Sequence, residues 1–207
     1  MTIRARLLSA SVIVLLACLG VGLTIALQHG AALQISAAQE AAQSQAFLSV
    51  MPPFSYDNQP MQHPLSLPER TADTQAVIAG YLATRGGKPS AVLFRSQAQG
   101  YSGPIELLIA VSIEGQLLGV KALKHNETPG IGARLMTEPA WLKRFIGRSL
   151  GDPPESAWSV KKDNGEFDQI AGATITSRAT VGAIRTTLRF FDAYRAQLMA
   201  LPSGRHP

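Results

Sequence analysis

The stretch that decides the fold runs from Ser90 to His125 and reads SAVLFRSQAQGYSGPIELLIAVSIEGQLLGVKALKH. Its three apolar runs are separated by glycine-containing turns, and this pattern predicts strands over 91–96, 105–112 and 117–125. The turn "IEGQ" places Gly115 where a tight hairpin favours a positive φ. Because strands joined by such short turns pair antiparallel, the stretch predicts an antiparallel sheet.

Helical and turn patterns follow this sheet. "EPAWLKRFIG", residues 138–147, has a proline near its start and apolar residues at helical spacing, which predicts a helix. "SRATVGAIRTTLRFFDAYRAQL", residues 177–198, predicts a long amphipathic helix. Between them, "WSVKKDNGEFDQI", residues 158–170, predicts a hairpin that turns at Asn164-Gly165. The expected fold class is α+β, a twisted antiparallel sheet with flanking helices in one domain over residues 71–201, with a flexible tail at 202–207.

The N-terminus predicts a membrane anchor. After Arg4 and Arg6, residues Leu7–Leu27 carry no charge, and a 21-residue helix crosses the roughly 30 Å hydrocarbon layer. The next basic residue after this span is Arg70, so the positive-inside rule predicts a cytoplasmic N-terminus. In a bacterium the chain is then a single-pass protein of the inner membrane with a periplasmic domain. A cleaved signal peptide and a lipoprotein lipidated at Cys18 are the alternatives.

The region between anchor and domain, residues 28–70, has two parts. Residues 28–51 have a helix-forming composition and predict a helix that leaves the membrane. Residues 52–64, "PPFSYDNQPMQHP", are proline-rich and predict either a linker or a loop wrapped on the domain.

Composition excludes several classes of function. The chain has 207 residues and a net charge of +5, but its 19 basic residues are scattered without a basic run, which argues against nucleic acid as a partner. It contains no Ser-His-Asp signature, no zinc-ligand cluster and no dinucleotide-binding glycine loop, so we predict no catalytic residues and no metal ligands. A single cysteine rules out an internal disulfide.

Two stretches call for more than a structural explanation. "HNETPGIGARL", residues 125–135, is either a solvated Pro-Gly turn or a backbone that turns closely around a ligand. In "DQIAGATITS", residues 168–177, we expect a helix to begin near Thr176 or Ser177. The unpaired N–H groups of a helix start stabilise phosphate, and Arg178, Arg185 and Arg189 share one face of this helix. Simple capping by Thr176 or Ser177 is equally compatible with the pattern.

Both stretches resemble motifs of one family. "DQIAGAT" resembles the Asp-x-x-Ser/Thr-Gly-Ala-Thr signature at which a flavin transferase joins FMN to threonine through a phosphoester. "HNETPGIG" resembles the His-x-Glu-Thr-Pro-Gly-Leu-Gly stretch of the same FMN-binding domain family. With the anchor, "YDN" and "GYSGPIELLIAV", the chain is similar to the G subunits of the Rnf (Rsx) ion-translocating electron-transport complexes. The C subunit of the sodium-translocating NADH:quinone reductase shares the motifs and is usually longer.

The resemblance implies covalent FMN on Thr174, with the phosphate beside the helix start. It implies further cofactor contacts at Asp168, Ala171, Gly172, Ala173, Thr176, Ser177, His125, Glu127, Thr128, Pro129, Gly130 and Gly132. Ala171 departs from the signature, which has Ser or Thr there.

The implied role is that of an electron relay within a translocase that exchanges electrons between ferredoxin and NAD while moving an ion. The implied partners are the membrane, subunits A, B, C, D and E of the complex, and the flavin transferase. His125 and Glu127 have two open interpretations, proton coupling to the flavin or structural hydrogen bonding. Two other functions remain open: a membrane-anchored binding module without redox chemistry, and a stand-alone periplasmic flavoenzyme.

Overall fold

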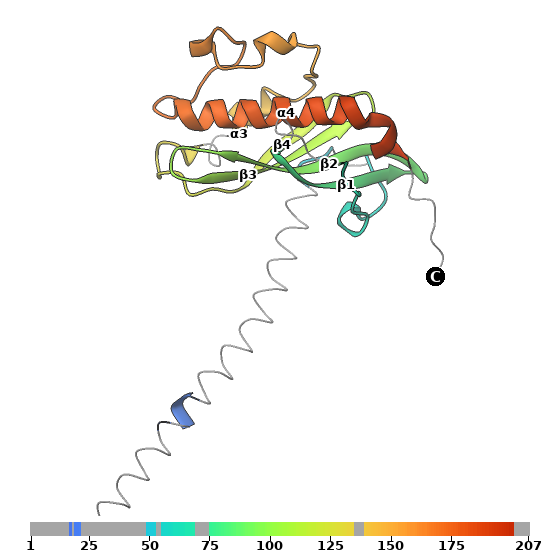
Figure 1. Cartoon of the computed structure of the whole chain (residues 1–207), viewed down its shortest axis with the longest axis horizontal. Coiled ribbons are helices and arrows are strands. Elements are labelled where there is room, and N and C mark those ends of the chain that lie inside the picture. Colours follow the sequence, from blue (N-terminus) through green and yellow to red (C-terminus); the bar gives the residue numbers. More distant parts are fainter. Residues whose placement is uncertain are drawn as a thin grey trace, which may run out of the picture. The chain divides into compact units, whose positions relative to one another are not determined.

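The computed structural model describes residues 17, 19–21, 49–52, 55–68, 75–134 and 139–200. The chain divides into two compact units, Met1–Gln45 and Ala46–Pro207, and the fold below is that of the second unit (Figure 1). Most of the predicted span 7–27, most of the predicted helix 28–51 and the tail 202–207 lie outside the described residues. Within the part that is described, no helix combines the length and apolar character needed to cross a membrane.

The second unit is built on one antiparallel sheet with strand order β1-β2-β3-β4. The strands are β1 (Val77–Arg85), β2 (Lys88–Gln99), β3 (Pro104–Ser112) and β4 (Leu117–Lys124). Sequence analysis predicted the last three within a few residues, and the antiparallel α+β class is confirmed. It missed β1, where Gly80 and several alanine and threonine residues weaken the apolar alternation.

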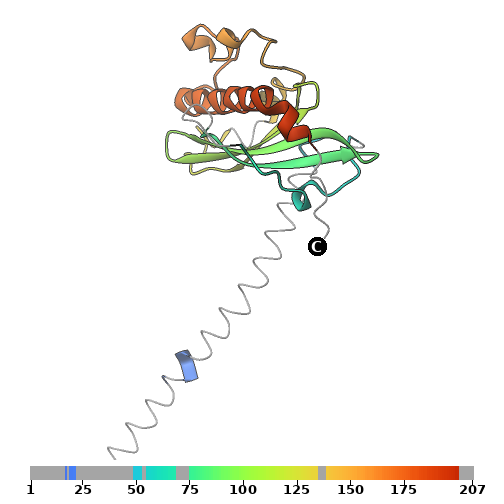
Figure 2. The same cartoon turned by 45° about the vertical axis from the view of Figure 1, so that its right-hand side comes forward.

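One face of the sheet packs against the long helix α4 (Thr174–Met199), which lies across it in both views (Figures 1 and 2). The ring of Phe94 in β2 meets Phe190 and Phe191 of α4 edge-on, with centroids 6.0 and 6.4 Å apart. A buried hydrogen bond between the hydroxyls of Ser96 and Thr187, 2.8 Å long, fixes the helix along the strand. The amphipathic pattern therefore buries one face of α4 on the sheet.

Residues 49–52 and 55–68 are here named the strap. Most of the strap's apolar side chains cover the opposite face of the sheet, whereas Leu65 and Leu67 pack against the cluster that contains α4. Val50 and Met51 are buried in a second apolar cluster with Leu93, Leu108 and Ala110 of the sheet. Of the two alternatives for the proline-rich stretch, the described part is a loop wrapped on the domain. It includes one short 3-10 helix, η1 (Pro60–Gln62).

The "YDN" stretch of the strap docks on the edge of β1. Asn58 donates to the carbonyl of Leu82 and accepts from the amide of Thr84, both at 2.9 Å. Asp57 Oδ2 accepts from the amide of Gly86 at 2.6 Å, in the turn between β1 and β2. These side chains use the free edge of the outermost strand, which limits edge-to-edge pairing with another chain. The predicted boundary at residues 70 and 71 lies outside the described residues.

The predicted hairpin over 158–170 is wrong. The segment follows η3 (Glu155–Ala157) and contains η4 (Lys161–Asp163), and its Val160 and Phe167 form a parallel bridge. The turn itself is real, since Asn164 adopts a left-handed conformation with φ 61°. Trp158 and Phe167 are both buried against the ring of Phe145, and this packing draws the two arms into the core in place of an antiparallel ladder.

The predicted helix over 138–147 is shorter than expected. Helix α3 spans Pro139–Lys143, and the chain continues in turns to Gly147, which has φ +81°. The apolar residues at helical spacing are still used, because Trp141 and Phe145 pack edge-on at 5.1 Å.

Candidate functional site

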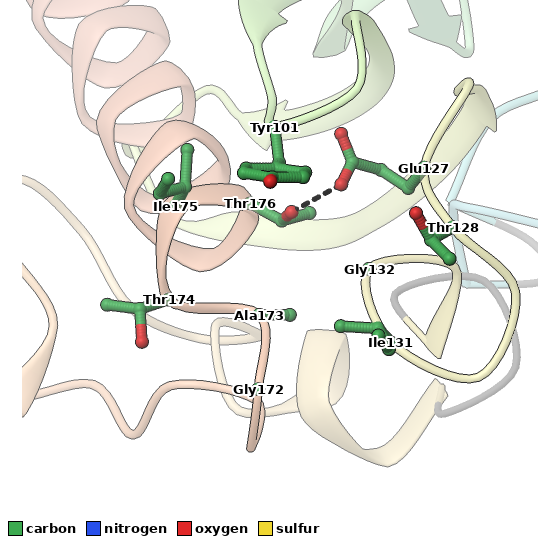
Figure 3. Close-up of a pocket in the computed structure, with 10 residues that line it drawn as sticks. All are labelled: Tyr101, Glu127, Thr128, Ile131, Gly132, Gly172, Ala173, Thr174, Ile175 and Thr176. Atoms are coloured by element: carbon green, nitrogen blue, oxygen red, sulfur yellow. Dashed lines mark hydrogen bonds between the residues drawn. The ribbon is translucent and has the colours of Figure 1, made fainter.

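The two stretches singled out by the sequence meet in one pocket of about 420 Å³ (Figure 3). The turn between β2 and β3 completes its wall. The lining residues are Tyr101, Glu127, Thr128, Ile131, Gly132, Gly172, Ala173, Thr174, Ile175 and Thr176. Segments far apart in the sequence therefore form a single site at the N-terminal end of α4.

Helix α4 begins two residues earlier than predicted, at Thr174. Ala173 is the N-cap and makes no side-chain capping bond, so the alternative in which Thr176 or Ser177 only caps the helix is wrong. The Ser177 amide donates to the Ala173 carbonyl at 2.9 Å, which makes this the first turn of the helix. The amides of Thr174, Ile175 and Thr176 precede that bond and carry the positive end of the helix dipole.

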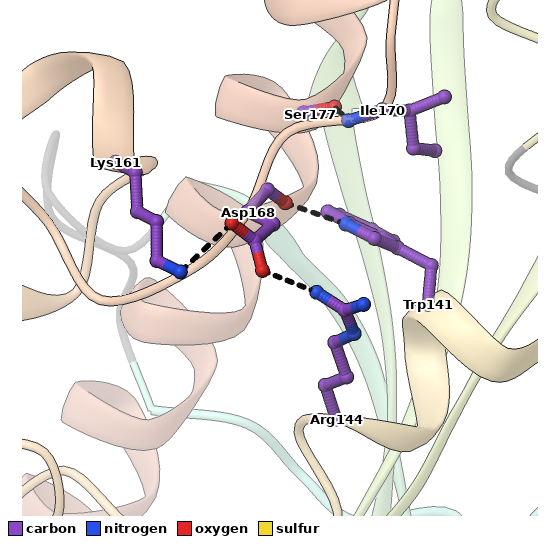
Figure 4. Close-up of polar contacts among 6 residues, drawn as sticks. All are labelled: Trp141, Arg144, Lys161, Asp168, Ile170 and Ser177. Atoms are coloured by element: carbon purple, nitrogen blue, oxygen red, sulfur yellow. Dashed lines mark hydrogen bonds and ion pairs between the residues drawn. The ribbon is translucent and has the colours of Figure 1, made fainter.

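Ser177 has a structural role beneath the pocket. Its hydroxyl donates to the carbonyl of Ala173 at 2.9 Å and accepts from the amide of Ile170 at 3.0 Å (Figure 4). Both bonds are buried and tie the incoming turn to the helix start. This predicted site residue is therefore fully engaged and does not line the pocket.

Glu127 joins the three segments of the site. Its side chain is buried, and Oε2 accepts a 2.6 Å hydrogen bond from the hydroxyl of Thr176 (Figure 3). Oε1 accepts from the amide of Ser102 at 3.1 Å, in the turn between β2 and β3. A Cβ on Gly100 or Gly132 would lie 2.2 Å from one of the carboxylate oxygens, so both glycines are required for space.

The hydroxyls of Thr174 and Thr176 differ in access. Thr176 is 1% exposed, and its hydroxyl is directed at Glu127. Thr174 is only partly buried, and its side chain points away from Glu127 at the edge of the pocket (Figure 3). Thr174 is thus the more exposed of the two threonines of "AGATIT".

Asp168 lies outside the pocket and holds the turn that leads to it (Figure 4). Its carboxylate pairs with Lys161 at 2.9 Å and Arg144 at 2.5 Å, and its carbonyl accepts a 2.6 Å bond from the indole of Trp141. The hydrogen bond from Lys161 and, less strongly, that from Arg144 lower the pKa of Asp168 below its ordinary value of 3.8. The residue anchors the start of the motif to α3 and η4.

The remaining predicted residues fall into two groups. Gly172, Ala173, Thr128 and Gly132 line the pocket as expected. Four residues of the two motifs are not part of its lining: Ala171, His125, Pro129 and Gly130. His125 Nδ1 accepts a hydrogen bond from the amide of Glu127 at 3.1 Å, so its ring shapes the loop.

Two arginines of α4 form ion pairs with the segment over 155–163. Arg178 makes two 2.5 Å bonds to Asp163, and these bonds raise the pKa of Arg178. Arg189 pairs with Glu155. Two of the three arginines on this face are therefore engaged in ion pairs outside the pocket lining.

Three pocket residues were missed by sequence analysis. Tyr101, Ile131 and Ile175 are 72%, 47% and 47% exposed, although each is large and apolar. Exposed apolar side chains gathered at a pocket are typical of a ligand site. The sequence pattern that could have predicted all three is an apolar residue surrounded by glycines or by hydroxyl-bearing residues.

The residues present fit an FMN group. Amides at the helix start suit a phosphate, Gly172 adopts φ +79° and leaves the approach open, and the apolar walls suit a flat ring. Among the residues that the structure describes, no group of three acidic, histidine or cysteine side chains is placed to hold a metal ion.

Comparisons with known proteins agree with this site. The FMN-binding domain family matches residues 100–189. The G subunit of the ion-translocating oxidoreductase complex of Pseudomonas aeruginosa (strain UCBPP-PA14) is 44% identical over 203 residues, covering 96% of this chain and 94% of that protein. The protein of the same name from Cereibacter sphaeroides (strain ATCC 17029) is 45% identical over 152 residues, 73% and 68% of the two chains.

A solved structure, that of Shewanella oneidensis NqrC, is 24% identical with a TM-score of 0.48, covering 74% of this chain and 73% of that one. The identity to the Pseudomonas relative extends over almost the whole of both chains. The chain belongs to the family formed by the G subunits of ion-translocating oxidoreductase complexes and carries the FMN-binding domain of that family.

Proposed function

We propose that this chain is the electron-relay subunit of a membrane-bound ion-translocating oxidoreductase and carries FMN esterified through its phosphate to Thr174. The observation that carries the proposal is the meeting of residues 127–132 and 172–176 in one pocket, with Thr174 at its accessible edge. The names of the relatives and the FMN-binding domain support the same role.

The local chemistry favours Thr174 over its neighbours as the attachment point. Thr176 and Ser177 are buried and hydrogen-bonded within the protein, so modification of either would break a bond that holds the site together. No such bond joins the Thr174 side chain to another of the residues that the structure describes, so its modification breaks none of them. The signature that "DQIAGAT" resembles places the acceptor at the same threonine.

The chain's residues would bind and orient the cofactor. The amides at the start of α4 would donate to the phosphate, and charge-assisted bonds of this kind contribute roughly 1.5–3 kcal/mol each. Ile131 and Ile175 would cover apolar parts of the ring. FMN itself supplies reversible electron transfer, and the protein supplies position and electrostatic environment.

The membrane assignment rests on the sequence. The uncharged run Leu7–Leu27 after Arg4 and Arg6 supports a single-pass anchor in the bacterial inner membrane, with a cytoplasmic N-terminus and a periplasmic domain. We propose that the domain there exchanges electrons with subunits A–E of the complex, in a path between ferredoxin and NAD. The covalent bond made by the flavin transferase keeps the cofactor from being lost to the periplasm.

The test is flavin fluorescence of the denatured chain on a gel, after expression with the transferase. We expect a fluorescent band for the natural chain and for Thr176→Val, and a dark band for Thr174→Val. Mass spectrometry should place the added FMN on the peptide that contains Thr174. A dark natural chain, or a flavin mapped to Thr176, would contradict the proposal.

A second measurement separates a relay from a stand-alone flavoenzyme. The flavin-loaded domain should exchange electrons with redox partners and show no turnover of small organic substrates. Steady turnover of such a substrate by the isolated domain would favour the enzyme interpretation.

A further inference from the structure

Tyr101 is the most exposed large apolar side chain in the part of the chain that the structure describes. It is 72% exposed, yet it lines the pocket and lies next to the Thr176–Glu127 bond (Figure 3). Nothing in the sheet or in α4 covers its ring. An aromatic ring held at a pocket wall and left open on one side is suited to contact with a ligand.

The backbone that carries Tyr101 is held firmly. The amide of Gly100 donates to the carbonyl of Gly103 at 2.8 Å, which closes the turn between β2 and β3. The amide of Ser102 donates to Glu127 Oε1 at 3.1 Å. The buried carboxylate that positions Thr176 therefore also positions the turn of Tyr101, so the phenol ring and the start of α4 form one assembly.

The other apolar groups of the pocket lie across from this ring. Ile131 comes from the loop after β4, and Ile175 comes from the first turn of α4. Both are aliphatic, so Tyr101 is the aromatic member of the pocket lining. Flat aromatic systems prefer offset stacking or edge contact with an aromatic partner, beyond what simple burial contributes.

We propose that Tyr101 packs its ring against the isoalloxazine of the FMN carried by Thr174, as a positioning contact outside the two motifs that predicted the FMN site. The inference rests on the proposed function, since it needs the flavin in this pocket. The phenol would also be the closest electron-donating side chain to the excited flavin in the pocket lining. Contact with a phenol shortens the excited-state lifetime of a flavin, because an electron passes from the phenol to the excited ring and then returns.

The test measures the fluorescence lifetime of covalent FMN in the folded full-length protein and in variants. Tyr101→Phe keeps a ring but removes the phenol donor, and Tyr101→Leu removes the ring as well. We expect a severalfold longer lifetime for both variants. The matched control is Tyr56→Phe, which removes a phenol hydroxyl outside the pocket lining and should leave the lifetime close to that of the natural protein.

A second readout concerns geometry. The visible circular dichroism of the bound flavin reports its asymmetric contacts, and we expect Tyr101→Phe to retain the natural spectrum while Tyr101→Leu loses much of it. Because Tyr101 is mostly exposed, both variants should fold, which far-ultraviolet circular dichroism checks.

The outcomes separate the two proposals. If the denatured chains carry flavin but Tyr101→Phe has the natural lifetime, the contact is refuted and the proposed function stands. Equal lengthening in Tyr56→Phe would also refute it, because the effect would then not come from the phenol at the pocket. If the denatured natural chain carries no flavin, the proposed function fails, and this inference fails with it.

Discussion

At the scale of single residues, the site depends on one buried carboxylate. Burial of Glu127 is tolerated because Thr176 and the Ser102 amide donate to it, and because Gly100 and Gly132 leave room for it. The same side chain fixes the loop after β4, the turn of Tyr101 and the helix start. Glu127 is therefore a positioning residue, and hydrogen bonding is the interpretation that its contacts favour.

Replacing Thr176 by valine tests this role. The change keeps the volume but removes the donor to Glu127 Oε2, and an unsatisfied buried group costs about 1–3 kcal/mol. We expect the free energy of unfolding, measured in urea, to fall by that amount. Thr174→Val, at a partly exposed position, should change it by less than about 0.5 kcal/mol. Equal effects of the two substitutions would mean that the Thr176–Glu127 bond contributes nothing.

The sequence predicted the site residues better than it predicted their roles. The resemblance singled out Thr174 and Glu127, and the structure brings both to one pocket. The hydrogen bond between Thr176 and Glu127 joins residues 49 positions apart, and no local pattern reports such a contact. Tyr101 was read as part of a turn, since the exposure of an aromatic ring depends on the tertiary fold.

At the scale of elements, ion pairs hold residues 161–168 against α3 and α4. Asp163 pairs with Arg178 of α4, and Asp168 pairs with Lys161 and Arg144. The positively charged partners lower the pKa of both carboxyl groups. Each of these carboxylates therefore adds stability in its ionised form.

Asp168→Asn should make the stability less dependent on acid pH. Because the folded-state pKa of Asp168 lies below 3.8, its contribution is complete above that value and is lost as the pH falls through the folded pKa. The natural protein should therefore be more stable than the variant at neutral pH, and the difference should shrink below pH 3.8. Urea unfolding at several pH values measures it.

The side chain of Asp168 is 48% exposed, so salt should weaken the same difference. If the difference in the free energy of unfolding between the natural protein and Asp168→Asn stays constant from neutral to acid pH, the assigned ion pairs are contradicted.

Prediction of the elements succeeded where local pattern decides and failed where packing decides. The strands β2, β3 and β4 follow from apolar runs and glycine turns. The parallel bridge between Val160 and Phe167 does not, because Trp158 and Phe167 are drawn to Phe145 from outside the segment. Helix α4 was recognised by its period, but its start moved to Thr174 because the Ala173 carbonyl accepts from Ser177.

Two strand glycines allow the strap to lie on the sheet. A Cβ on Gly119 would lie 2.0 Å from the backbone carbonyl of Val50, whereas one on Gly80 would lie 2.9 Å from the end of the Leu67 side chain. To avoid a new Cβ on Gly119, the backbone at Val50 has to shift. To avoid one on Gly80, the Leu67 side chain has only to change its rotamer. We expect Gly119→Ala to lower the free energy of unfolding by about 1–3 kcal/mol and Gly80→Ala to cost less.

Limited proteolysis measures the effect of Gly119→Ala and Gly80→Ala on the strap itself. Gly119→Ala should expose residues 49–52 to cleavage before the rest of the domain unfolds, and Gly80→Ala should leave them protected. If both substitutions give the natural cleavage rate and the natural stability, the strap is not held by this close approach.

At the scale of the whole molecule, the unit Ala46–Pro207 is a sheet covered on both faces. Helix α4 covers one face, with Leu65 and Leu67 of the strap packed against the same cluster, and the strap residues around Val50 and Met51 cover the other (Figure 2). The pocket is formed by the helix start and by loops, and none of its lining residues belongs to the strap. We therefore expect the strap to contribute to the stability of the unit but not to the pocket.

Truncation tests this division. A chain of residues 46–207 keeps the strap and one of residues 71–207 lacks it, and both start after the predicted membrane span. Burial of Val50 and of Met51 is worth roughly 1.5–3 kcal/mol each, so the shorter chain should be less stable by at least about 3 kcal/mol.

The shorter chain should also bind a hydrophobic dye, because the apolar face that contains Leu93 and Leu108 loses its cover. Flavin attached per folded molecule should be the same in the two chains, since none of the residues that line the pocket belongs to the strap. Equal stability without dye binding would show that the strap is a linker and that the sheet is stable with one face open. Loss of flavin attachment from a folded 71–207 chain would show that the strap helps to build the site.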